Sequence, residues 1–294
     1  MMQSRQCGIA LVQVLLVTAI IMLLVMALSL TAADQVKRAQ ALKDRSEASL
    51  YLHSREVAML YTLLTESLLP GQETSNPYAA SWNFHGQPFV VDGLEFTLQD
   101  QSGLMRFPVS GVSDFEKLLT TLGRGPTEAR DIAGRLADWM GIAQPGGRQA
   151  DDAMMRGATG DPVQYFGELR FLAGMDEQLY RQLAELMTLY PTPGFNPLTA
   201  PAPLLRTRMP ESTLGAIIEA RRNGELDQGS LWQIARIGMD ETTLPFPGPG
   251  VGVRIAGEYR GITLRRRFVV GVQPHDRQPL TSWSRDRLGS GIPK

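Results

Sequence analysis

The stretch that decides the fold is IALVQVLLVTAIIMLLVMALSLTAA, residues 9–33. It is uncharged, and no charged residue occurs between Arg5 and Asp34. A bilayer core requires roughly 20 apolar residues in a helix, so this stretch is long enough to span a membrane. The short basic leader MMQSRQCG, residues 1–8, precedes it.

The junction between Gly8 and Ile9 is predicted to be a processing site. A secretory signal carries its small-residue cleavage site after an apolar region of about 7–15 residues. Here the glycine stands before the apolar run, and no clean Ala-x-Ala site closes that run. An uncleaved signal anchor is the alternative.

The apolar stretch continues into a long amphipathic segment. Neither Gly nor Pro occurs from Ile9 to Leu69, and the helix-breaking pair Pro70-Gly71 follows. One helix of about 90 Å is therefore allowed, with a membrane half at 9–33 and a periplasmic half at 34–69. In the second half, apolar residues recur at spacings of three and four from Val36 through Leu42 and Leu50 to Leu68. His53 falls on this stripe, where we expect a half-buried packing role.

Composition narrows the function classes. The formal net charge of −1 over 294 residues gives no bulk attraction for nucleic acid. The only cysteine is Cys7, in the leader, so the remaining chain has no disulfide. Arg5 is the only charge before the span, which favours a cytoplasmic N-terminus and places the bulk of the protein in the periplasm or outside the cell.

The rest of the chain predicts an α+β fold. Residues 88–100 are expected to form two strands about a turn at Asp92-Gly93, and 251–256 and 261–272 two more about Tyr259-Arg260. We therefore expect a sheet from 82–110 and 250–273 and a large helical insertion at 111–245. The expected helices are 112–122, 126–139, 166–174, 176–190, 210–223 and 230–237. The polar tail at 274–294 is expected to stay mobile.

The sequence contains few candidates for metal-binding, phosphate-binding or DNA-binding sites. The three histidines show no metal-ligand spacing. Glycines at 248–252 precede a strand, which favours a turn over a phosphate-binding loop. The helical pair 210–223 and 230–237 resembles a helix-hairpin-helix unit in which Arg221 and Arg222 could contact DNA, but its mixed charge favours protein packing.

Several segments, in this order, resemble one known family. They are RQCGIALVQVLL at 5–16, LQDQSGLM at 98–105, LADW at 136–139, FGELRFLAGM at 166–175 and FNPLTA at 195–200. On a stem of this kind they resemble the minor pseudopilin K family of type II secretion systems (GspK), over nearly the whole chain.

The resemblance implies a pilin-like long helix packed on an antiparallel sheet, with an all-helical domain inserted between strands. It implies a non-catalytic subunit, cleaved between Gly8 and Ile9 by the prepilin peptidase, N-methylated at Ile9, and anchored in inner-membrane lipid with its soluble domain in the periplasm. Its implied partners are the minor pseudopilins I and J and, through them, the major pseudopilin, without nucleic acid. The fifth mature position is Gln13 where most such subunits carry glutamate, which the resemblance links to a position at the pseudopilus tip. Leu42, on the apolar stripe, is the expected assembly contact.

The chain departs from the family pattern in two respects. Gly141 and Ala143 replace oxygen donors that usually follow the Asp-Trp segment, and the cysteine pair of some members is missing. No cofactor is therefore expected. Calcium remains an open alternative with Asp151, Asp152 and Asp161 as candidate ligands, while solvated acids are the simpler interpretation.

Two other functions are compatible with part of this sequence pattern. A tip subunit of a type IV pilus or competence pseudopilus that binds DNA or surfaces would share the stem, and a basic patch on the helical hairpin or tail would favour it. An anchored periplasmic hydrolase would need a convergent catalytic set, which the sequence does not offer.

Overall fold

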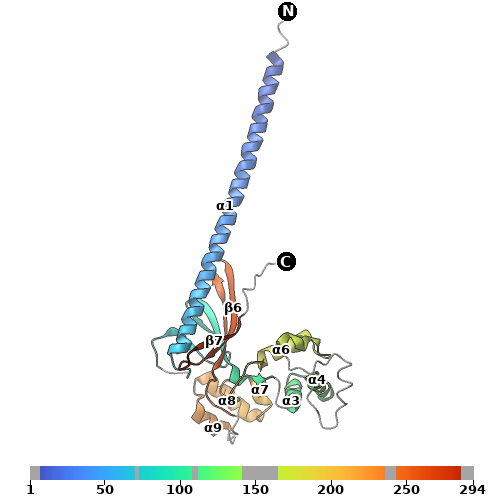
Figure 1. The fold of residues 1–294 in the computed structure, drawn as a ribbon, viewed down its shortest axis with the longest axis vertical. Coiled ribbons are helices and arrows are strands. Elements are labelled where there is room, and N and C mark those ends of the chain that lie inside the picture. Colours follow the sequence, from blue (N-terminus) through green and yellow to red (C-terminus); the bar gives the residue numbers. More distant parts are fainter. Residues whose placement is uncertain (1–6, 70–72, 108–111, 141–164, 236–242, 286–294) are drawn as a thin grey trace, which may run out of the picture. The chain divides into compact units, whose positions relative to one another are not determined.

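The computed structural model describes residues 7–69, 73–107, 112–140, 165–235 and 243–285 of the chain (Figure 1). The chain divides into two units. One comprises Met1–Glu56 with Glu258–Leu264, and the other comprises Val57–Gly257 with Arg265–Lys294. The helix α1 (Cys7–Thr65) and the hairpin of β5 (Gly250–Tyr259) and β6 (Ile262–Val272) contribute residues to both units.

The first unit is built on α1, which is the single long helix that the sequence predicts. It ends at Thr65, a few residues before the helix-breaking pair at 70–71. Every side chain from Leu11 to Lys43 is exposed, including the apolar stretch, whose mean hydropathy is 2.9. An uncovered apolar surface of this length is unfavourable in water. The segment therefore suits a single-pass membrane anchor.

The tip of the β5–β6 hairpin is fixed on α1 within the same unit. The ring of Tyr259 stacks on that of Tyr51, with centroids 4.6 Å apart and an interplanar angle of 21°. The guanidinium of Arg260 pairs with the carboxylate of Glu47. The hairpin turn uses Arg260 and Gly261, both at positive φ, one residue later than the turn predicted from sequence.

The second unit contains an antiparallel sheet, as predicted. Its strand order is β1-β2-β5-β6-β7, with β1 at Phe89–Val91, β2 at Leu94–Asp100 and β7 at Leu280–Arg285. β2 pairs with β5 in the register Phe96↔Ile255. Along β2, Leu94, Phe96 and Leu98 are buried and Glu95 is exposed, which confirms the predicted alternation. The turn between β1 and β2 lies at Asp92-Gly93, both at positive φ, as expected for a two-residue hairpin.

Strand β7 corrects the expectation of a mobile tail for residues 280–285, while the end of that tail, 286–294, lies outside the described residues. It pairs antiparallel with β6, in the register Gly271↔Thr281. The indole of Trp283 lies over Gly250 and Gly271, where an added Cβ would come within 3 Å of the ring, and it stacks on Tyr190 at a centroid distance of 5.2 Å. Two glycines on neighbouring strands therefore create the space that the tryptophan fills, and this packing orders a polar segment.

Apart from α1 and α2 (Pro77–Ser81), which precede β1, the helices lie between β2 and β5 in sequence, which makes them an insertion in the sheet. The main bounds are α3 (Val112–Thr121), α4 (Pro126–Trp139), α6 (Glu177–Leu186), α8 (Glu211–Asn223) and α9 (Gln228–Ala235). Shorter ones are α7 (Ala202–Arg206) and the 3-10 helices η1 (Gln101–Gly103) and η2 (Phe166–Phe171). The α+β class and the inserted helical region are thus as predicted.

Two hydrophobic clusters hold the insertion together, and Figure 1 shows the corresponding groups of helices. One gathers residues of α3, α4, η2 and α6, such as Phe115, Ile132 and Leu183. The other gathers residues of α7, α8 and α9, such as Leu214 and Ile217. The short helix α7, which the sequence analysis missed, joins them because its successive residues Leu204 and Leu205 belong to different clusters.

The predicted sheet region 82–110 is shorter than expected. The main sheet ends at Asp100, and Met105–Arg106 (β3) pairs instead, in parallel, with β4 (Met187–Thr188). The helix expected to run to residue 190 accordingly ends at Leu186. The turn η1 redirects the chain at this point, so β3 leaves the sheet and enters the insertion.

Candidate functional site

Helix α1 carries two apolar faces. The inner face consists of Ala48, Leu52, Met59 and Leu63, which are all almost completely buried. The outer face consists of the stripe recognised in the sequence, and it lies about a third of a turn away at 3.6 residues per turn. The stripe is therefore not the face that packs within this chain.

The outer face is open to solvent beyond the apolar anchor. Val36, Leu42, Leu50 and Val57 are 69%, 65%, 68% and 48% exposed. His53 also lies here and is exposed, so the predicted half-buried packing role is wrong. The physical reason is that the α1 residues buried within the chain, such as Leu52, lie on the inner face, whereas His53 lies on the exposed one.

The other N-terminal positions singled out in the sequence also belong to α1. Gln13 is exposed within the apolar stretch, and Gly8 and Ile9 lie in the first turn of the helix, with side chains outside the described set. The processing junction, Gln13 and Leu42 are therefore carried by one continuous helix.

A buried carboxylate joins the sheet to the insertion. Asp100, at the end of β2, is completely buried. Its Oδ1 accepts hydrogen bonds from the backbone N–H of Ser102 (2.9 Å) and of Gly248 (3.1 Å). Its Oδ2 accepts from Asn196 Nδ2 (2.8 Å) and Thr199 Oγ1 (2.9 Å). The segments 98–105 and 195–200, which carry the family resemblance, thus meet at one side chain.

Burial of the Asp100 carboxylate is electrostatically unfavourable. Burial raises the pKa of Asp100, although the bonds from Asn196, Ser102, Thr199 and Gly248 each act to lower it. Four donors satisfy the acceptor sites of a carboxylate, and without them burial of the charge would be strongly unfavourable. Asp100 is therefore a structural junction between three chain segments.

Glycines make this junction possible. An added Cβ at Gly103 would lie 2.6–2.8 Å from Thr199, including its backbone carbonyl, and one at Gly248 would lie 2.1 Å from the hydroxyl of Ser102. Backbone contacts this close exclude any side chain. The glycines near 248–252 thus serve close packing, in agreement with the sequence interpretation that they form no phosphate loop.

Arg221 supports the loop at 195–200 from α8. It is partly buried and donates from Nη2 to the carbonyl oxygen of Pro197 at 2.7 Å. Burial lowers the pKa of Arg221 to about 10. Burial, together with the positive charge of Arg221, lowers the pKa of His85 to about 4, so His85 is neutral at pH 7. Of the two arginines considered as DNA contacts, Arg221 is therefore used in protein packing, as are the apolar residues of α8 and α9, whereas Arg222 is exposed.

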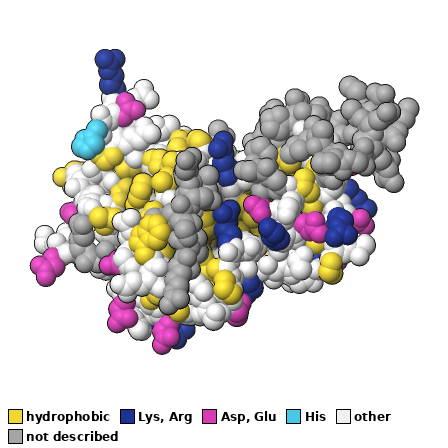
Figure 2. Space-filling view, turned by 90° about the horizontal axis from the view of Figure 1, so that it is seen from below, with side chains coloured by type: hydrophobic (Ala, Val, Ile, Leu, Met, Phe, Trp, Pro, Cys, Tyr) yellow, Lys and Arg dark blue, Asp and Glu magenta, His cyan; other side chains and the backbone are white. Residues whose placement is uncertain are grey.

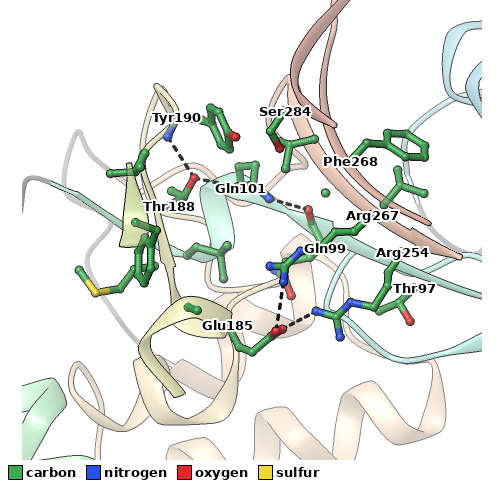
Figure 3. A pocket seen from close by; sticks show the side chains of 18 of the residues that line it. Thr97, Gln99, Gln101, Glu185, Thr188, Tyr190, Arg254, Arg267, Phe268 and Ser284 are labelled. Atoms are coloured by element: carbon green, nitrogen blue, oxygen red, sulfur yellow. Dashed lines mark hydrogen bonds and ion pairs between the residues drawn. The ribbon is translucent and has the colours of Figure 1, made fainter. Parts of the chain in front are cut away.

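A pocket of about 280 Å³ lies between strands β2, β5 and β6 of the sheet and helix α6 (Figure 3). Arg254 of β5 and Arg267 of β6 both point to Glu185 of α6, with Arg267 Nη1 3.5 Å from Glu185 Oε1. All three side chains are about half exposed, so solvent screens these ion pairs and each contributes less than about 1 kcal/mol to stability. The sequence analysis did not identify this pocket, because its lining comes from segments separated by more than 150 residues.

Charges elsewhere are mixed. Figure 2 shows acidic and basic side chains interspersed across one face of the molecule, with no continuous basic stripe among the residues described there. Pairs such as Arg206 with Glu211 and Arg124 with Asp176 neutralise charges on the insertion. This distribution does not favour a nucleic-acid interface.

The calcium candidates Asp151, Asp152 and Asp161 lie outside the described residues, as do Gly141 and Ala143. Within the described ranges, no three His, Cys, Asp or Glu side chains gather as a metal-binding group.

Comparison with known proteins points to one family. The sequence model described as "Type II secretion system (T2SS), protein K" matches residues 98–192. This range begins at the Asp100 segment and ends beside the pocket.

Three curated relatives are each described as type II secretion system protein K. The Pseudomonas aeruginosa protein is 31% identical over 240 residues, which cover 69% of this chain and 68% of the relative. The Klebsiella pneumoniae protein is 30% identical over 207 residues, with 62% of each chain covered. The Pectobacterium carotovorum protein is 26% identical over 218 residues, with 65% of each covered. The chain thus spans less than two thirds of the latter two relatives.

A solved structure shares the fold. It is a chain of the GspK-GspI-GspJ complex from the type 2 secretion system of enterotoxigenic Escherichia coli, with a TM-score of 0.52 and 17% identity. The match covers 85% of this chain and 98% of that one.

Proposed function

The chain belongs to the type II secretion system protein K family, and we propose that it is a minor pseudopilin, a non-catalytic subunit at the tip of a pseudopilus that supports export of folded proteins across the outer membrane. In this proposal α1 anchors the protein in the bacterial inner membrane by a single pass. The second unit then lies in the periplasm.

The observation that carries the proposal is the outer face of α1. Leu42 and Leu50 are about two-thirds exposed on a helix whose opposite side already supplies the residues buried within the chain. Exposed apolar surface of this extent marks an interaction site. Since the face continues from an apolar anchor, the partner that fits it is another helix standing upright in the same membrane.

The identity of the partners follows from the family. The solved structure that shares the fold is a complex of GspK with GspI and GspJ. We propose that the corresponding minor pseudopilins I and J pack on the outer face and connect this chain to the major pseudopilin. The prepilin peptidase would act on the leader before assembly.

The alternative is a tip subunit of a type IV pilus or competence pseudopilus that binds DNA or surfaces. It would use the same anchor, but the binding face would need a basic patch. Arg221 is partly buried and bonded to the carbonyl oxygen of Pro197, and the charges in Figure 2 are mixed, so these observations favour the secretion subunit.

The proposal is tested by introducing a charged side chain on the outer face of α1. Leu42→Glu should weaken co-purification of the full chain with the minor pseudopilins I and J and reduce secretion, without changing the melting of the second unit. Lys37→Gln is the matched control, because it also lowers the charge by one and lies on the opposite side of the helix. Normal assembly and secretion with Leu42→Glu would contradict the proposed interface.

A further inference from the structure

The pocket beside Glu185 has an unbalanced charge. Two guanidinium groups, of Arg254 and Arg267, share the single carboxylate of Glu185 (Figure 3). Each guanidinium has five N–H donors, and the contacts to Glu185 use only part of them. The pocket therefore keeps one net positive charge and free donors in the fork geometry that binds carboxylates.

Three polar groups of the pocket wall, those of Gln99, Gln101 and Thr188, are engaged in hydrogen bonds. Thr188 Oγ1 donates to Gln101 Oε1 at 2.7 Å, and Gln101 Nε2 donates to the carbonyl oxygen of Gln99 at 3.3 Å. The backbone N–H of Tyr190 donates to Thr188 Oγ1 at 3.2 Å. These bonds fix part of the lining, and the two arginines are its only positively charged donors among the lining residues.

The shape of the pocket limits the ligand. Gly252 lines the pocket without a side chain, and an added Cβ there would lie 2.9 Å from Gln101 Nε2. Phe166, Tyr180 and Leu189 add apolar wall beside the charged groups. A volume of about 280 Å³ is at the lower limit of small-molecule sites. It suits one amino acid side chain, with a methylene stem against the apolar wall and a charged end at the arginines.

We propose that this pocket binds the carboxylate of an acidic side chain presented by another polypeptide. The site is independent of the outer face of α1, so the two proposals can fail separately. The same chemistry could come from a free small carboxylate, and the experiment distinguishes the two sources.

The test uses the full chain in detergent micelles and a fluorescein-labelled hexapeptide, Gly-Ser-Glu-Phe-Gly-Ser, with its glutamine counterpart as the matched probe. At low ionic strength, where charge contacts are least screened, fluorescence anisotropy should show at least tenfold tighter binding of the glutamate peptide. Arg254→Gln and Arg267→Gln should each reduce that preference to within twofold. Arg265→Gln, an exposed arginine of the same strand outside the pocket, should retain it.

Three results would overturn the proposal. The first is equal binding of both peptides. The second is a loss of the preference for the glutamate peptide in Arg265→Gln that equals the loss in the two pocket variants. The third is displacement of the peptide by free glutamate at the concentration at which the peptide itself saturates the pocket. The last would assign the pocket to a small carboxylate. If Arg267→Gln does not fold, Arg267→Lys provides the measurement, because it keeps the charge but loses the fork and should lower the preference at least threefold.

Discussion

Asn196 donates a hydrogen bond from Nδ2 to Oδ2 of Asp100 over 2.8 Å, although the two residues are 96 positions apart in the chain. Both side chains are completely buried. This bond ties the loop at 195–200 to the end of β2, and the loop is in turn held by Arg221 through Pro197.

Removal of this carboxylate should destabilise the second unit strongly. Asp100→Ala would leave the backbone N–H groups of Ser102 and Gly248 buried without an acceptor, at about 1–3 kcal/mol for each. We expect a loss of at least about 3 kcal/mol in urea unfolding, against less than about 0.5 kcal/mol for the exposed control Glu95→Ala on the same strand. In a double-mutant cycle, Asp100→Ala and Asn196→Ala should be non-additive. Additive losses would show that the bond carries no coupling.

His85 should make folding stability depend on pH. Its pKa in the folded protein is about 4, against 6.5 for the free side chain. Between these values the unfolded chain binds a proton that the folded protein excludes, so stability that is present above pH 6.5 is lost as the pH falls toward 4. The loss is at most roughly 3 kcal/mol.

The measurement compares urea unfolding at pH 7 and pH 4.5 for the wild type and for His85→Gln. The variant should lose less stability on acidification, whereas the exposed control His53→Gln should behave as the wild type. Asp100, whose pKa is raised, acts with the opposite sign, which is why the comparison between variants is needed. An identical acid sensitivity in His85→Gln would refute the assignment.

Processing is predicted between Gly8 and Ile9, with N-methylation of the new Ile9 amine. Mass spectrometry of the mature chain, in cells that process other pseudopilins, should show Ile9 as the first residue. A different first residue, or an intact leader, would exclude this site.

Calcium is predicted to stabilise the second unit little, because Gly141 and Ala143 stand where the family carries oxygen donors. A ligand at a concentration equal to its Kd adds only about 0.4 kcal/mol. Thermal melts of a fragment starting near Ala33 should hardly shift in millimolar calcium. A large upward shift would indicate a site that includes Asp151, Asp152 or Asp161.

Gln13 is predicted to mark a tip subunit. A glutamate at the fifth mature position can pair with the N-terminal amine of a neighbour, whereas glutamine only hydrogen-bonds, and burial of an unpaired charge costs several kcal/mol. The simpler explanation is that glutamine is less costly than glutamate in lipid. We expect one copy per pseudopilus, because the helical insertion would clash in a filament of close-packed stems.

Gln13→Glu should accordingly leave cleavage intact and still form no homopolymer. Gold labelling of detached pseudopili should place the chain at one end. Label spread along the shaft would refute the tip position.

The sequence by itself determined the local features. The absence of Gly and Pro from 9 to 69 allowed one helix, the alternation of Leu94, Phe96 and Leu98 set the buried face of β2, and Asp92-Gly93 set a turn, because each depends on neighbours within a few residues.

Tertiary structure alone decided the rest. The apolar stripe predicted on α1 is its outer face, because periodicity identifies an apolar face but not which of two such faces is buried within the chain. The polar tail became β7 because Gly250 and Gly271, remote in sequence, leave space for Trp283. Asp100 contacts Asn196, and Glu185 contacts Arg254 and Arg267. Both contacts depend on how the insertion packs back against the sheet. This is long-range packing, which no local sequence pattern records.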